Sequence, residues 1–266
     1  MKQLFRKILG YPVIYYLKKV KRNIAPNASE RALAIREKAE LIKNTAFYAR
    51  FIDQNDFCFD IGANFGNRIK PLLKIGAKVL AVEPQEACYE FLQMKFGKEI
   101  ILVTKGIGSK EEVKDFYISN MSTISSFSQE WIKSVKENRF KNWNWDKSIQ
   151  IEMTTIDNLI SLYGKPTFIK IDVEGYELEV LKGLSQGIKL VSFEYTVPEQ
   201  IDQALNCISR LQEIDNNIEL NYCIDEKMKF ALSNWISAED MKTLIRTEEF
   251  IETYFGDIYV RNKSID

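Results

Sequence analysis

The sequence predicts an α/β fold, in which a mostly parallel β-sheet is covered by helices on both faces. From Phe57 onward, short apolar runs alternate with segments whose apolar residues recur at helical spacing. Two of these runs end in acidic residues and glycines, at residues 60–66 and 172–175. The chain has 266 residues and is 45% hydrophobic, which suffices for one large domain with an extension.

The N-terminal part of the chain differs from the rest. The first 22 residues are rich in lysine and arginine and contain no acidic residue. Their apolar stretch, residues 8–17, is too short to span a bilayer, and no small-residue cleavage site follows it. We expect a helical extension packed on the core; the alternative is a peripheral contact with an anionic membrane surface. Asn27 and Ser29 can cap a helix over residues 31–51, which divides the chain into an extension (1–52) and a domain (53–266).

Five apolar runs predict the central parallel strands: residues 57–61, 79–82, 100–103, 168–173 and 190–195. Residues 113–118 and 149–154 also have strand character, and we expect them to pair with each other at an edge of the sheet. The end of the chain predicts a strand at 218–224, a helix at 238–254 and a strand at 257–261.

Composition restricts the chemistry that is available. Lysine plus arginine and aspartate plus glutamate each number 37, so the fold has no net positive charge for duplex nucleic acid. The chain has no histidine, so proton transfer must use a carboxylate, a lysine, a tyrosine or water. Its four cysteines show no metal-ligand spacing, and no metal site is predicted. Isolated cysteines favour a reducing compartment, so we expect a cytoplasmic protein, with the inner face of a membrane as the alternative location.

The first strand-to-helix junction has the features of a cofactor site. Gly62 and Gly66 permit a tight turn and close approach of a ligand to the backbone. Asp60 precedes the turn, and Glu83 ends the next strand, where a carboxylate commonly binds the ribose hydroxyls of an adenosine cofactor. The spacing D-x-G-x-N-x-G differs from the dinucleotide fingerprint G-x-G-x-x-G. An acidic residue before the turn also suits a cationic amino-acid group better than a pyrophosphate, which favours S-adenosyl-L-methionine over NAD.

The second junction places Lys170, Asp172 and Glu174 on one face of a strand. A lysine inside a sheet that is covered on both faces is costly unless it is paired. We expect Lys170 to pair with Asp60 or with Glu194, and so to hold Asp172 and Asp60 in place. The alternative is a purely structural ion pair with no role in turnover.

A polar insertion at residues 119–146 contains aromatic side chains among serines and asparagines. Aromatic faces beside hydrogen-bonding groups suit a carbohydrate, so we predict a lid in which Trp131 and Trp143 contact the substrate. The alternative is that these rings only pack a surface helix onto the sheet. Glu194, at the end of its strand, is a further candidate for the substrate pocket.

Four motifs together resemble the FkbM family of S-adenosylmethionine-dependent methyltransferases. They are FDIGANFG (59–66), AVEP (81–84), TTID (154–157) and IKIDVEGYE (169–177), of which the last is the most specific. The resemblance covers roughly residues 57–195. It implies a Rossmann-like sheet of seven strands whose last strand, 257–261, is antiparallel. It also implies methyl transfer to a hydroxyl, often of a sugar or a secondary metabolite.

The resemblance also implies roles for individual residues. Glu83 would bind the ribose, and Ile107 and Gly108 would approach the adenine. Asp172 and Glu174 would face the methyl acceptor, and since histidine is absent, we expect one of them to be the base, supported by Lys170. The cofactor site implied in full is Asp60, Gly62, Ala63, Asn64, Gly66, Glu83, Pro84, Ile107 and Gly108.

We therefore predict an O-methyltransferase that acts on a hydroxyl of a sugar, glycan or glycolipid-like acceptor. One alternative is an NAD-dependent Rossmann oxidoreductase, which would need a third glycine near Asn67 and a catalytic tyrosine–lysine pair or histidine at a recognisable spacing. Another is a non-catalytic binding domain of the same fold, which the carboxylates at both junctions disfavour. Methylation of an RNA 2′-hydroxyl is disfavoured by the zero net charge. The sequence leaves the oligomeric state open.

Overall fold

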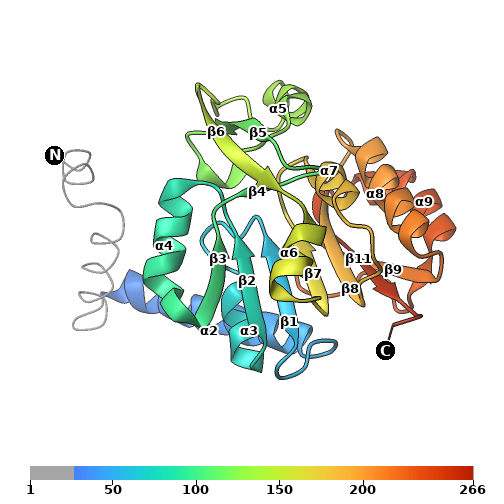
Figure 1. The fold of residues 1–266 in the computed structure, drawn as a ribbon, viewed down its shortest axis with the longest axis horizontal. Helices are drawn as coiled ribbons and strands as arrows, with labels where there is room; N and C mark the ends of the chain where they lie inside the picture. Colours follow the sequence, from blue (N-terminus) through green and yellow to red (C-terminus); the bar gives the residue numbers. More distant parts are fainter. Residues whose placement is uncertain (1–26, 266) are drawn as a thin grey trace.

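A computed structural model describes residues 27–265 of the chain. The fold is α/β, with a large sheet between two layers of helices and a small sheet beside it (Figure 1). The basic segment at residues 1–22 lies outside the described residues, so the expected helical packing and the alternative membrane contact both remain predictions. Within residues 27–265, no helix combines the length and the apolar character needed to cross a bilayer.

The large sheet has eight strands in the order β10-β9-β11-β8-β7-β1-β2-β3. All neighbouring pairs from β8 to β3 are parallel, whereas β11 is antiparallel to β8 and β9, as predicted for the last strand. The eighth strand is a two-residue addition at the edge beside β9. The strands are β1 (Phe57–Ile61), β2 (Lys78–Val82), β3 (Ile100–Val103), β7 (Phe168–Ile171), β8 (Leu190–Thr196), β9 (Ile218–Ile224), β10 (Ile236–Ser237) and β11 (Phe255–Asn262).

Helices cover both faces of this sheet because the strand residues alternate between two apolar clusters. In β1, Cys58 packs on the face covered by α2, α3 and α4, whereas Phe59 and Ile61 pack on the face covered by α6 to α10. The first layer comprises α2 (Ala28–Tyr48), α3 (Ile69–Ile75) and α4 (Glu86–Phe96). The second comprises α6 (Ile156–Tyr163), α7 (Glu177–Lys182), α8 (Ile201–Ile214), α9 (Ala238–Ile245) and α10 (Glu248–Ile251).

Of two helices predicted outside the central sheet region, one is present as a single helix and the other is divided in two. The helix expected at 31–51 is α2, and Asn27 caps it in a capping box with Glu30. The single helix expected at 238–254 is two helices, because the Thr247 side chain accepts a hydrogen bond from the Phe250 amide and starts α10 as a new helix.

The strands at residues 113–118 and 149–154 pair as predicted, but not at an edge of the large sheet. They are β5 (Val113–Ile118) and β6 (Lys147–Thr154), and together with β4 (Gly106–Ile107) they form a separate three-stranded sheet. This sheet and α5 (Gln129–Lys136) lie beyond one end of the large sheet (Figure 1). Between β5 and α5 lies a short 3-10 helix, η2 (Ser122–Ile124). We call residues 119–146, which include η2 and α5, the lid segment.

The end of α2 belongs to the core of the domain although most of the helix is exposed. Phe47 is 3% exposed, and its ring contacts those of Tyr48, Phe51, Phe230 and Tyr259. These contacts join α2 to the antiparallel strand β11 and to the loop that precedes β10.

We expect Phe47→Ala to lower the free energy of unfolding by about 3–5 kcal/mol, because it leaves a cavity among four rings. Leu33→Ala on the same helix is the matched control; Leu33 is 49% exposed, and its truncation should change stability by less than about 0.5 kcal/mol. Urea unfolding followed by circular dichroism measures both. Equal effects of the two substitutions would mean that α2 is not part of the cooperative unit.

Candidate active site

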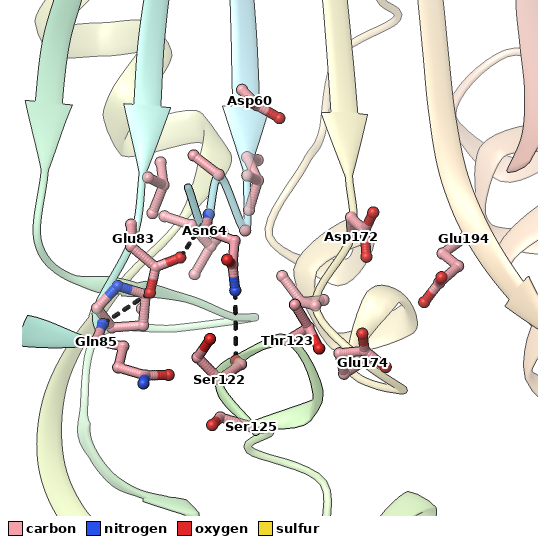
Figure 2. A pocket seen from close by; sticks show the side chains of 18 of the residues that line it. Asp60, Asn64, Glu83, Gln85, Ser122, Thr123, Ser125, Asp172, Glu174 and Glu194 are labelled. Atoms are coloured by element: carbon pink, nitrogen blue, oxygen red, sulfur yellow. Dashed lines mark hydrogen bonds between the residues drawn. The ribbon is translucent and has the colours of Figure 1, made fainter. Parts of the chain in front are cut away.

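A cavity lies at the carboxyl ends of β1, β2, β7 and β8, which is where open α/β sheets bind ligands. It encloses about 1080 Å³, counting the part that is open to solvent. Acidic side chains from the large sheet face residues of the lid segment across this space (Figure 2). The sheet contributes Asp60, Glu83, Asp172, Glu174 and Glu194, and the lid segment contributes Ser122, Thr123, Ser125 and Phe127.

Glu83 is fixed at one end of the cavity by backbone donors. It is 5% exposed, and its two carboxylate oxygens accept hydrogen bonds from the amides of Asn64 (2.7 Å) and Gln85 (2.8 Å). Burial raises the pKa of Glu83 to about 7, although the two backbone donors oppose that shift. The Asn64 side chain donates in turn to the carbonyl of Ser122 at 3.3 Å, which links this junction to the lid segment (Figure 2).

Gly62 allows the two junctions to touch. Its φ of 85° is in the left-handed region, and a Cβ atom there would clash with the backbone carbonyl of Asp172. A Cβ on Gly66 would meet the ring of Phe96 on α4 instead. The two glycines therefore serve contacts within the protein, and the cavity wall includes Gly62 but not Gly66.

Asp60 presents an unsatisfied oxygen at the cavity wall. The residue is 2% exposed, and its Oδ2 atom has no hydrogen-bond partner among the described residues. Burial raises the pKa of Asp60 to about 6, against the opposing effect of Lys170 and Arg68. A buried carboxylate oxygen without a donor suits a cationic ligand group, and an amino-acid ammonium meets that need.

Lys170 has different partners from those predicted. It is fully buried and donates to Asp257 at 2.6 Å and to Asp172 at 3.1 Å, rather than to Asp60 or Glu194. Burial works against its charge, but Asp172 and Asp257 outweigh that effect and raise the pKa of Lys170. The partners of Lys170 differ from the prediction because β11 inserts beside β8 and brings Asp257 close to the lysine. The direct ion pair with Asp172 was not predicted.

Three carboxylates converge at the other end of the cavity. One carboxylate oxygen from each of Asp172, Glu174 and Glu194 lies within 4.8 Å of the other two. Figure 2 shows the three side chains facing a common space. Glu174 has a φ of 54°, so the turn after β7 holds this residue in the left-handed region. Burial and then the neighbouring carboxylates raise the pKa of both Glu174 and Glu194 well above the usual range.

The predicted substrate contacts of Trp131 and Trp143 are not found, because neither residue lines the cavity. Trp131 is 1% exposed and packs against Gly175, where a Cβ atom would clash with the indole. Trp131 belongs to a small hydrophobic cluster that also contains Val135, and Trp143 packs against this cluster. These rings form the core of the lid segment, and Ser122, Thr123, Ser125 and Phe127 line the cavity instead.

Among the other predicted cofactor residues, Ala63, Asn64, Pro84 and Ile107 line the cavity, whereas Gly108 does not. Gly108 contacts Gly183, where a Cβ atom would clash with its carbonyl oxygen. The cavity wall also includes residues that were not predicted, among them Arg68, Gln85, Phe116 and Glu226, for which the chain carries no recognisable signal.

We expect Lys170→Met to lower the free energy of unfolding by about 3–5 kcal/mol, because it leaves Asp257 buried without its counter-ion. Adding Asp257→Asn to that variant removes the stranded charge and should recover most of the loss. Chemical denaturation of the two single variants and the double variant gives the coupling. Strictly additive losses would contradict a direct ion pair.

The parallel sheet, the glycine turn after β1, the acidic residue at the end of β2 and the cavity between them are typical of S-adenosylmethionine-dependent methyltransferases. Residues 60–224 match the family model described as the methyltransferase FkbM domain. The chain belongs to this family, and its cofactor is S-adenosyl-L-methionine. The oxidoreductase interpretation is thereby set aside.

The chain is 25% identical over 146 residues to the hexuronic acid methyltransferase AglP of Haloferax volcanii. That match includes 53% of this chain and 55% of AglP, so the chain spans about half the length of this relative.

Solved methyltransferase structures are similar at low identity. The precorrin-6y C5,15-methyltransferase of Geobacter metallireducens has a TM-score of 0.43 at 9% identity, covering 85% of this chain and 86% of its own. A TehB-like S-adenosylmethionine-dependent methyltransferase of Corynebacterium glutamicum has a TM-score of 0.42 at 10% identity, covering 89% and 100%.

Proposed function

We propose that this enzyme transfers a methyl group to a hydroxyl of a sugar, glycan or glycolipid-like acceptor. The observation that carries the proposal is one cavity with two chemically distinct ends. Glu83 and the turn after β1 form one end, and Asp172, Glu174 and Glu194 form the other. A hydroxyl acceptor requires a group that takes its proton, and among residues 27–265 the second end offers the carboxylates of Asp172, Glu174 and Glu194 for this purpose.

Two further observations support a sugar as the acceptor. The lid segment presents hydroxyl groups of Ser122, Thr123 and Ser125 to the cavity, beside the ring of Phe127. Polar groups around an apolar ring match the alternating polar and apolar surfaces of a sugar. The relative AglP is named for a sugar acid, which agrees with this class of acceptor.

The cofactor residues divide by position along the cavity. We assign the ribose hydroxyls to Glu83, whose oxygens keep free lone pairs beyond the two amides they accept from. We assign the methionyl ammonium to Asp60, because its Oδ2 atom has no other partner. Ile107 and Phe127 offer apolar surface for the adenine. The cofactor supplies an electrophilic methyl group, so this chain mainly aligns the acceptor oxygen and removes its proton.

Glu83→Ala should weaken S-adenosylmethionine binding by about 10- to 100-fold, since a hydrogen bond to a charged group contributes roughly 1.5–3 kcal/mol. Isothermal titration calorimetry at about pH 8 measures this under conditions in which the carboxylate is ionised. Glu86→Ala, one helix position beyond Gln85 and outside the cavity, is the control and should bind normally. Unaltered affinity of Glu83→Ala would remove this residue from the cofactor site.

Methyl transfer to a sugar hydroxyl can be tested with methyl-labelled cofactor and a panel of glycosides, comprising neutral hexosides, hexuronides and a glycolipid. We expect label in at least one sugar, in a form that survives mild alkali because an ether has formed. Label that is released by mild alkali would indicate a methyl ester on a hexuronide carboxylate, and would contradict transfer to a hydroxyl. A heat-denatured enzyme sample provides the background.

A further inference from the structure

Three carboxylates form a row across the carboxyl end of the large sheet. Asp257 on β11 is the register partner of Glu194 on β8. Asp172 directly follows Ile171, whose partner on β8 is Phe193, so Asp172 flanks Glu194 from the other side. Glu194 is therefore the central member of the row.

Lys170 contacts the outer members of this row and not the central one. Its ammonium group donates to Asp257 at 2.6 Å and to Asp172 at 3.1 Å. Within residues 27–265, its one other hydrogen bond is to the Ile171 carbonyl at 3.3 Å. The buried positive charge is thus committed to Asp257 and Asp172.

Glu174 and Glu194 have no such counter-ion. Within residues 27–265, neither side-chain carboxylate makes an ion pair or a hydrogen bond. The nearby Arg139 directs its guanidinium to Val197, Glu199 and Tyr254 instead. The remaining neighbour, Glu177, adds negative charge and is occupied by the amides of Val173 and Gly175 and by Gln203.

Two carboxylates within 4.8 Å of each other and without a counter-ion cannot both ionise easily. Such a pair holds one proton between its members over a wide pH range, and it titrates in two coupled steps. Its second ionisation is displaced to higher pH, which makes the ionised member a stronger base.

We propose that Glu174 and Glu194 form a coupled carboxylate pair that receives the proton of the acceptor hydroxyl, and that Asp172 and Asp257 leave this pair without a counter-ion by binding Lys170. This inference rests on the proposed function. It excludes Asp172 as the base, because protonating Asp172 would leave the buried ammonium with one counter-charge instead of two. It also gives a role to Asp257, which lies outside the family match at residues 60–224.

The proposed step is balanced in atoms and charge. The acceptor oxygen forms a bond to the methyl carbon, and the carbon–sulfur bond breaks with its electron pair remaining on sulfur. The hydroxyl proton passes to the ionised member of the Glu174–Glu194 pair. A cationic sulfonium and an anionic carboxylate are replaced by a neutral thioether and a neutral carboxylic acid.

The pair can be observed directly by ¹³C NMR of the full-length enzyme labelled at glutamate Cδ and saturated with S-adenosylhomocysteine. Spectra of Glu174→Gln and Glu194→Gln assign the two resonances, and Glu111→Gln, at an exposed position outside the cavity, is the control. We expect the pair to complete its titration well above the other glutamates. Each pair substitution should lower the apparent pKa of the remaining partner by about one unit or more. Asp257→Asn should lower that of Glu194, because it removes an adjacent negative charge and frees Lys170.

Two results would overturn the proposal. One is a titration of Glu174 and Glu194 in the range of the exposed glutamates. The other is loss of the high-pH step on addition of MgCl₂, which would mean that the three carboxylates hold a metal ion instead of a proton. Failure to bind S-adenosylhomocysteine in calorimetry would contradict the proposed function alone, since the titration of the free enzyme still decides the pairing.

Activity provides a separate readout once an acceptor from the glycoside panel is known. We expect Glu194→Gln to lower kcat by at least about 100-fold with little change in KM, as for loss of a general base. Asp257→Asn should shift the acidic limb of the pH–kcat profile to lower pH. A uniform loss across all pH values without that shift would indicate a structural role only, and would contradict the proposal that Asp257 keeps Lys170 away from the pair.

Discussion

The buried ion pair of Lys170 with Asp257 is the interaction on which the acidic end of the site depends. A fully buried ammonium group loses its hydration and is retained only where counter-charges replace the water. Here β11 runs antiparallel beside β8 and places Asp257 across from Glu194, within 2.6 Å of the lysine. Because Lys170 also binds Asp172, the last strand of the sheet orients a residue at the end of β7. The antiparallel strand thus has a direct electrostatic role at the site in addition to joining β8 to β9.

The two strand-to-helix junctions are coupled through their backbones as well. The amide of Asp172 donates to the carbonyl of Ile61, and Gly62 leaves space for the carbonyl of Asp172. Any side chain at position 62 would separate β1 from β7 where the cofactor end of the cavity meets the acidic end. In the function that we propose, packing between neighbouring strands, which is more rigid than a loop, would set the position of the donor methyl relative to the acceptor.

The sequence was sufficient to predict the parallel strands of the sheet and the residues at their carboxyl ends, because both follow from local patterns. Alternating apolar runs predicted β1, β2, β3, β7 and β8, and glycine and acidic residues marked their ends. The partner of Lys170 could not be predicted in this way, since it depends on where the last strand inserts. Asp257 lies 87 positions from Lys170, and nothing in the chain relates the two.

The predicted substrate contacts of the tryptophans in the lid segment were wrong for a related reason. Its tryptophans are the most conspicuous side chains in the sequence, and a binding surface and a small hydrophobic core use the same residue types. The segment extends beyond the main sheet and needs a core of its own, which Trp131, Ile132 and Val135 form with the neighbouring rings. Only the packing of Trp131 on Gly175 reveals which role applies, and that contact joins residues 44 positions apart.

The distribution of charge in the cavity fits the reaction that we propose. Asp60, Glu83, Glu174 and Glu194 are acidic, while the cations of this region are committed: Lys170 to Asp172 and Asp257, and Arg68 toward Glu226 at 3.7 Å. Such a cavity favours a cofactor with a sulfonium and an ammonium group over one with a pyrophosphate. Methyl transfer removes the sulfonium charge, and a carboxylate that gains a proton loses its own charge in the same step. The two opposite charges disappear together, so the reaction leaves no unpaired charge in the half-buried site.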